Sequence, residues 1–207
     1  MIKDECNILS FDVGIRNLAY VVLSGVSKEK KYGVVESWDV IDLGKVTSVE
    51  ACAGKLYSEL SQRFAGLKKI DYVLIERQPK ARSIMMVAIQ MFLCMFFSDP
   101  ERVSHVHFAS ASRKLSMCLL EFPKPIVTLQ EVGPKKDSKK SRAKYVVNKE
   151  YAVEACKKYL DVMEDYASAS LLEVYKKKDD MCDAFLQAIA FVENDGVCTK
   201  PHYKKKK

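Results

Sequence analysis

Hydrophobic positions along the chain fall into short apolar runs and longer runs with helical spacing. The short runs are rich in branched and aromatic residues and are bounded by turn-forming residues, a pattern that predicts β-strands. They cover Cys6–Asp12, Leu18–Leu23, Tyr32–Ile41, Asp71–Ile75 and Val103–Phe108. A Ser/Gly/Lys turn at residues 24–31 joins the second run to the third. The first three strands are therefore expected to form an antiparallel meander.

Apolar residues at helical spacing predict helices between and after these strands. The predicted helices are Ser48–Phe64, Ile84–Phe97, Ser110–Leu120, Lys144–Leu160 and Asp179–Glu193. Residues 134–145 have the composition of a loop, because Gly133 and Pro134 break the pattern before them. The order of elements predicts an α/β fold in which a mixed five-stranded sheet carries helices on both faces. A chain of 207 residues is expected to form a single domain.

The predicted helix Ile84–Phe97 is apolar almost all the way round, since it contains four methionines and three phenylalanines. It is interrupted by Gln90 and is shorter than the ~20 residues that a membrane-spanning helix needs. We expect no membrane association. Such a helix must be covered on all sides, either by the protein's own core or by a partner subunit.

Positive charge is concentrated in one part of the chain, whose net charge is +7. Residues 134–158 carry nine Lys or Arg against three acids, and the tail at 199–207 ends in four lysines. Clustered basicity is typical of proteins that bind nucleic acid. The basic insert at 134–145 supplies the candidate DNA contacts Lys135, Lys136, Lys139, Lys140, Arg142 and Lys144. Solvated surface lysines are the alternative interpretation, above all for the tail.

Cysteine usage indicates a reducing, intracellular compartment. The seven cysteines are odd in number and form no Cys-x-x-Cys pair. No secretory signal precedes the first strand-like run. We therefore expect the cysteines to act mostly as small hydrophobic core residues.

Four carboxylates lie where a fold could bring distant acids together. Asp12 ends the first strand and is followed by Gly14, and Glu76 comes directly after the strand Asp71–Ile75. Asp180 and Asp183 share one face of the last helix, because they are three residues apart. Converging carboxylates repel one another and need a cation, and Mg²⁺ prefers oxygen ligands. In a basic chain these features indicate a metal-dependent nuclease.

Each acid also has a simpler interpretation. Asp12 could cap a turn, Glu76 could be an exposed partner of Arg77, and acids in the first turn of a helix are favoured by its dipole. The dipole does not account for Asp183, which lies further into the helix. Lys149 is a second candidate, because an ammonium near the acids could stabilise charge on a phosphate; a solvated helix lysine is the alternative.

Three segments resemble the Holliday junction resolvases of poxviruses and related large DNA viruses, relatives of bacterial RuvC in the RNase H-like superfamily. The segments are Phe-Asp-Val-Gly-Ile-Arg-Asn-Leu-Ala-Tyr at 11–20, Ile-Glu-Arg-Gln-Pro at 75–79 and Lys-Lys-Asp-Asp-Met-Cys-Asp-Ala at 177–184. The order of predicted elements agrees with this family from about Ile8 to Val192.

The resemblance implies an RNase H-like fold and a Mg²⁺-dependent endodeoxyribonuclease that cuts opposing strands of four-way junctions in a virus-infected cell. It assigns two Mg²⁺ per site, for which Mn²⁺ is expected to substitute, to Asp12, Glu76, Asp180 and Asp183, and it gives Lys149 a catalytic role. Asp179 is an extra acid whose register competes with Asp180. The resemblance also implies a homodimer through the helix at 82–97, bound to branched DNA.

Three other functions compete with this interpretation. Actin-like kinases and ATPases also open with a strand and an Asp-x-Gly turn, but they need a second glycine-rich phosphate hairpin, which this chain of eight glycines lacks. A different RNase H-like nuclease could cut flaps or RNA–DNA hybrids. A non-catalytic protein that binds branched DNA would explain the charge but not the four acids.

Overall fold

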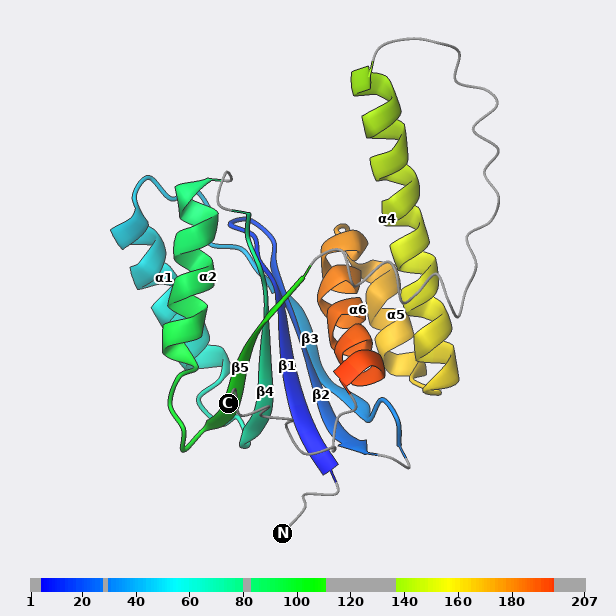
Figure 1. The fold of residues 1–207 in the computed structure, drawn as a ribbon, viewed down its shortest axis with the longest axis horizontal. Coiled ribbons are helices and arrows are strands. Elements are labelled where there is room, and N and C mark those ends of the chain that lie inside the picture. The colour runs from blue at the N-terminus through cyan, green and yellow to red at the C-terminus, as the bar shows by residue number, and fades with distance from the viewer. Residues whose placement is uncertain (1–4, 28–29, 80–82, 111–136, 196–207) are drawn as a thin grey trace, which may run out of the picture.

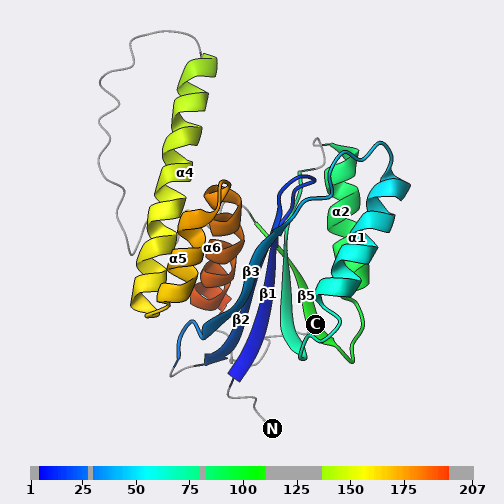
Figure 2. The same ribbon diagram turned by 180° about the vertical axis from the view of Figure 1, so that it is seen from behind.

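The computed structural model describes residues 5–27, 30–79, 83–110 and 137–195. Within them lies one five-stranded sheet with the strand order β3-β2-β1-β4-β5. Helices cover both of its faces, with α1 and α2 on one side and α4, α5 and α6 on the other (Figure 1). The view from behind shows the same two layers on the sheet (Figure 2). The predicted α/β architecture is confirmed.

The strands follow the predicted order. They are β1 (Glu5–Asp12), β2 (Leu18–Ser27), β3 (Val34–Ile41), β4 (Ile70–Glu76) and β5 (Val103–Ala109). The predicted meander is present, because β1 pairs with β2 and β2 with β3 in antiparallel fashion. By contrast, β4 is parallel to both β1 and β5. The carboxyl ends of β1, β4 and β5 therefore meet at one edge of the sheet.

The helices are α1 (Val49–Arg63), α2 (Ile84–Phe96), α4 (Asp137–Val162), α5 (Tyr166–Val174) and α6 (Lys178–Asp195). Ser48 caps α1, because its side chain accepts a hydrogen bond of 3.2 Å from the Ala51 amide. No helix in the part of the chain that the structure describes is long and apolar enough to cross a bilayer. The helix predicted at Ser110–Leu120 lies outside the described residues, apart from Ser110.

The helices differ from the prediction in two places. The segment 134–145 was expected to be a loop, but α4 already begins at Asp137. Lys and Arg are good helix formers, so a basic segment can be helical without an apolar face of its own. The short helix α5 was not predicted; Asp165 caps it by accepting from the Ser168 amide at 2.9 Å.

The sheet separates two hydrophobic cores, because successive strand residues point to opposite faces. One core packs strand residues such as Phe11 and Ile75 against α1 and α2. The other packs strand residues such as Leu74 against α4, α5 and α6. In this second core Phe185 is fully buried, and its ring centroid lies 5.4 Å from that of Trp38.

The segment before α6 is tied to the edge strand β3. The Tyr175 hydroxyl donates to Asp39, which also accepts from Arg63 Nη1 at 2.5 Å. Burial alone would raise the pKa of Asp39, but the hydrogen bonds from Tyr175, the Val40 amide and Arg63 outweigh it and lower that pKa. The same contact with Asp39, reinforced by burial, raises the pKa of Tyr175 to about 12. These contacts hold the segment between α5 and α6 against β3.

Candidate active site

Asp12 and Glu76 lie at the ends of neighbouring parallel strands. Phe11 pairs with Ile75 in the β1–β4 register, so the next residue of each strand is one of the two acids. Phe11 and Ile75 point into the core on the α1/α2 side. Alternation therefore directs Asp12 and Glu76 to the face that α6 covers. The structure places Glu76 as the last residue of β4 rather than just beyond the strand, as the sequence had suggested.

The turn after Asp12 requires a glycine at position 14. A Cβ at Gly14 would lie 2.5 Å from the Asn17 carbonyl oxygen, which is closer than real Cβ contacts allow. The chain therefore reverses tightly directly after the first acid. Asp12 itself is 9% exposed. The short reversal keeps the Asp12 side chain at the end of the sheet.

Gln187 fixes α6 against the end of β1. Its Nε2 atom donates to Ser10 Oγ at 3.0 Å and to the Phe11 carbonyl oxygen at 3.1 Å, and the side chain is buried. Asp183 and Asp180 lie one and two turns before Gln187, so they share its face of the helix. The structure thus brings the α6 acids to the sheet face onto which Asp12 and Glu76 project.

Asp180 is partly buried and lies among charges of both signs. Burial raises the pKa of Asp180, and the charges of Asp179 and Asp183 raise it further, while Lys149 and Lys177 lower it. An acid in such surroundings is stabilised in its ionised form by a nearby cation.

Two glutamines hold Glu76 and the segment that follows it. Gln78 Nε2 donates to Glu76 Oε2 at 2.8 Å, and the Gln78 amide donates to Gln90 Oε1 at 2.6 Å. Gln90 is the polar residue that interrupts the apolar helix α2. Sequence reasoning missed the roles of Gln78, Gln90 and Gln187. For Gln90 and Gln187 the available signal was an amide inside an apolar run, because a buried polar group needs hydrogen-bond partners.

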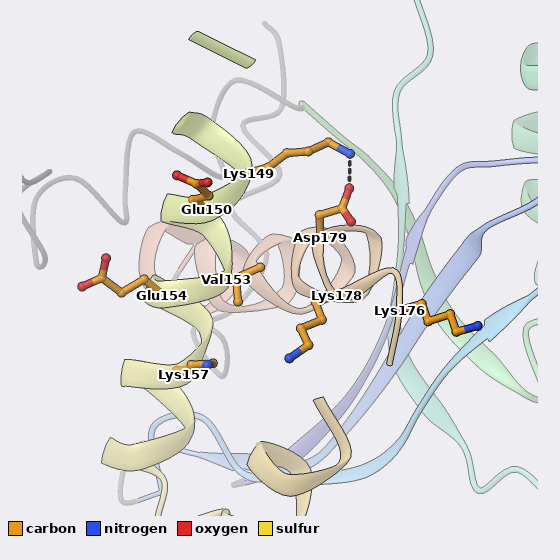
Figure 3. Close-up of a pocket in the computed structure, with 8 residues that line it drawn as sticks. All are labelled: Lys149, Glu150, Val153, Glu154, Lys157, Lys176, Lys178 and Asp179. Atoms are coloured by element: carbon orange, nitrogen blue, oxygen red, sulfur yellow. Dashed lines mark hydrogen bonds and ion pairs between the residues drawn. The ribbon is translucent and has the colours of Figure 1, made fainter. Parts of the chain in front are cut away.

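Lys149 approaches the acids from α4. Its ammonium forms an ion pair with Asp179 at the start of α6 (Figure 3). The two residues lie at the rim of a pocket of about 480 Å³ between α4 and α6. The pocket is lined by Lys149, Glu150, Val153, Glu154, Lys157, Lys176, Lys178 and Asp179. Lys149 thus lies near the predicted acids. Its ion-pair partner, however, is Asp179, which was not among the four predicted metal ligands.

The described residues hold no group of three or more His, Cys, Asp or Glu side chains spaced to hold a metal ion. The four predicted acids form two pairs on adjoining elements, Asp12 with Glu76 and Asp180 with Asp183. Their oxygen-only donor chemistry fits Mg²⁺. The four acids therefore have the ligand chemistry that Mg²⁺ prefers. Among the described residues, the two pairs are not close enough together to form one ligand group.

Four of the six candidate DNA contacts lie in the first half of α4. Lys139, Lys140, Arg142 and Lys144 belong to this helix, whereas Lys135 and Lys136 lie outside the described residues. This half of α4 extends past the other helices (Figure 1). The predicted basic insert is thus, in its described part, the extension of the helix that also carries Lys149.

No family model matches this chain, and a curated protein shares sequence with it. The relative is an uncharacterized protein of Acanthamoeba polyphaga mimivirus, 31% identical over 147 residues. The match covers 67% of this chain and 32% of the mimivirus protein, so the chain spans about a third of that relative's length.

Solved structures with this fold include three junction resolvases. Fowlpox virus resolvase, solved with its Holliday junction DNA, matches with a TM-score of 0.57 and 16% identity, over 90% of this chain and 97% of that one. The yeast mitochondrial resolvase Ydc2 matches at 0.53 and 18%, over 93% and 81%. Thermus thermophilus RuvC matches at 0.52 and 13%, over 92% and 96%. The resemblance seen in the sequence is confirmed for the fold.

Proposed function

We propose that this protein is a Holliday junction resolvase, an endodeoxyribonuclease that cuts opposing strands of four-way DNA junctions. One observation carries the proposal. Asp12 and Glu76 project from adjacent strand ends onto the sheet face where Gln187 holds α6 with Asp180 and Asp183. The fold shared with three resolvase structures supports the choice of substrate. The mimivirus relative supports a role in a virus-infected cell, on intermediates of recombination or replication.

Two Mg²⁺ ions are the proposed cofactors, and Mn²⁺ is expected to substitute for them. Asp12, Glu76, Asp180 and Asp183 would hold them. When bound, such ions supply an activated water and stabilise the leaving oxygen of a phosphodiester. The chain's own contribution is to keep these acids on a rigid strand pair and on one helix face.

Lys149 and the basic half of α4 are proposed to bind the DNA backbone. The Lys149 ammonium would donate to an oxygen of the phosphate at the cleavage site, where negative charge develops. Lys139, Lys140, Arg142 and Lys144 would contact phosphates further along the arm. Contacts of this kind position the junction without reading its sequence, and they weaken steeply as the salt concentration rises.

The exposed side of α2 is proposed as the surface of a homodimer. Ile84 is 80% exposed and Met95 is 74% exposed, and Met91 lies on the same side of the helix. Tyr57 of α1 extends this apolar surface, because its ring contacts Phe96. Two copies that pair through this surface would present two active sites, as the cutting of opposing strands requires.

Replacing Met95 with glutamate is expected to weaken the dimer by at least about 30-fold, since burying an unpaired charge in an interface costs 2 kcal/mol or more. The exposed position predicts little change in the stability of the monomer. Sedimentation equilibrium measures the association. Val174→Glu is the matched control, because Val174 is 78% exposed on α5, across the sheet from α2. Equal association of both variants and the wild type would exclude α2 as the interface.

A junction cleavage assay tests the activity itself. Purified protein is incubated with Mg²⁺ and a labelled four-way junction, a flap, an RNA–DNA hybrid or a linear duplex. We expect paired, symmetric nicks in the junction that give ligatable duplexes, and no nicks when EDTA is present. Cleavage of flaps or hybrids alone would mean that one of these, and not the four-way junction, is the substrate. Junction binding without cleavage, across several divalent ions, would favour a non-catalytic branched-DNA-binding protein.

A further inference from the structure

Asp179 and Asp180 are adjacent in the sequence but have different surroundings at the start of α6. The Asp179 carboxylate forms an ion pair with Lys149, 30 residues earlier in the chain. The pair is partly shielded from water, because the Asp179 side chain is 18% exposed and that of Lys149 is 34% exposed. Figure 3 shows Lys149 reaching from α4 toward this carboxylate. Asp179 therefore engages α4.

The geometry of α6 directs Asp180 elsewhere. Gln187 marks the side of the helix that faces the end of β1, because it donates to the Phe11 carbonyl. At 3.6 residues per turn, Asp180 lies about 20° around the helix axis from Gln187, Asp183 about 40° and Asp179 about 80°. Asp180 and Asp183 thus lie nearer to the direction of Asp12 than Asp179 does.

We propose that Asp179 is a positioning residue for Lys149 and not a metal ligand. The inference rests on the proposed function. A lysine ammonium has three donors, so the ion pair with Asp179 and a contact with a phosphate oxygen of DNA can be made at the same time. The ion pair also restricts a side chain that otherwise loses much of its rotamer freedom when it binds a phosphate. Asp179 thus prepares Lys149 to bind the phosphate.

The same ion pair makes Asp179 a poor metal ligand. A divalent cation on its carboxylate would lie within a few ångströms of the Lys149 ammonium, and like charges at that separation repel. Binding the metal there would require the ion pair to break. Metal binding at Asp180 leaves this ion pair intact, because the partner of Lys149 in it is Asp179. The two neighbouring acids therefore have separate tasks.

A measurement of metal binding distinguishes the roles of Asp179 and Asp180 without a cleavage assay. Mn²⁺ binding is measured by the loss of the free-ion signal in electron paramagnetic resonance, for wild type, Asp179→Asn and Asp180→Asn. We expect Asp180→Asn to weaken Mn²⁺ binding by at least about tenfold. Asp179→Asn should bind Mn²⁺ as the wild type does. Weakening by Asp179→Asn as large as that by Asp180→Asn would overturn the inference. Wild-type protein that binds no Mn²⁺ would instead overturn the proposed function.

A double-mutant cycle on junction cleavage tests the link to Lys149. Lys149→Gln is expected to lower the single-turnover rate by about 10²-fold. Asp179→Asn should lower it about tenfold in the wild-type background but leave it unchanged in the Lys149→Gln background. Asp179→Glu keeps a carboxylate for the ammonium and should recover part of the rate. If thermal unfolding shows that Asp179→Asn is misfolded, Asp179→Glu replaces it in the cycle. Equal losses from the Asp179 variant in both backgrounds would overturn the inference.

Discussion

Asp12→Asn is expected to lower junction cleavage by at least about 10³-fold, because losing a charged metal ligand removes several kcal/mol of transition-state stabilisation. Asparagine has the same shape as aspartate, so the tight turn at Gly14 and the packing of β1 should be preserved. Binding of the junction should therefore stay within a few-fold of wild type. Single-turnover cleavage and a gel-shift titration measure the two quantities separately.

Asp161→Asn is the matched control for this substitution. Asp161 is exposed near the end of α4, 12 residues beyond Lys149, and the same change of charge there should leave cleavage unaltered. Substantial cleavage by Asp12→Asn would remove Asp12 from the active site. Loss of binding and cleavage together would indicate that Asp12 maintains the structure instead.

Phe185→Ala is expected to lower the free energy of unfolding by about 3–5 kcal/mol. Phe185 is fully buried, and its ring packs on Trp38, whose indole nitrogen donates to the Met181 carbonyl at 3.1 Å. Truncation would leave a cavity between α6 and the sheet, directly behind the acid-bearing face. Urea denaturation followed by circular dichroism gives the change in free energy.

Val174→Ala serves as the control for stability, because Val174 is 78% exposed and its truncation should change the free energy of unfolding by less than about 0.5 kcal/mol. A loss below about 1 kcal/mol for Phe185→Ala would mean that α6 is held mainly by other contacts. The hydrogen bonds from Gln187 to the end of β1 would then be the first candidates.

The strands and the placement of the strand acids could be predicted because both depend on local pattern. Apolar runs such as Asp71–Ile75 are followed directly by an acid, here Glu76. Parallel strands bring their carboxyl ends to one edge of the sheet. The beginning of α4 could not be predicted in the same way. Residues 137–143 are polar and basic, and composition alone does not distinguish a solvated helix from a loop. The short helix α5 gave too few turns for its periodicity to stand out.

The details of the site depend on contacts that no local pattern encodes. The ion pair between Lys149 and Asp179 joins residues 30 apart, and Gln187 reaches residues 176 and 177 positions earlier. The sequence therefore placed two acids at strand ends and two on one helix face, but it left the register of Asp179 and Asp180 open. Helix geometry and the ion pair supply the physical basis for the choice between them.

The division of the interior into two cores has a consequence for how this protein can vary. Residues such as Ile89 and Leu93 pack only on the α1/α2 side of the sheet, whereas Phe185 and Leu186 pack only on the α6 side. A substitution on one side thus reaches the other only through the strands. Selection could remodel the apolar exterior of α2, and with it the choice of oligomeric partner, while the acid-bearing side keeps its arrangement.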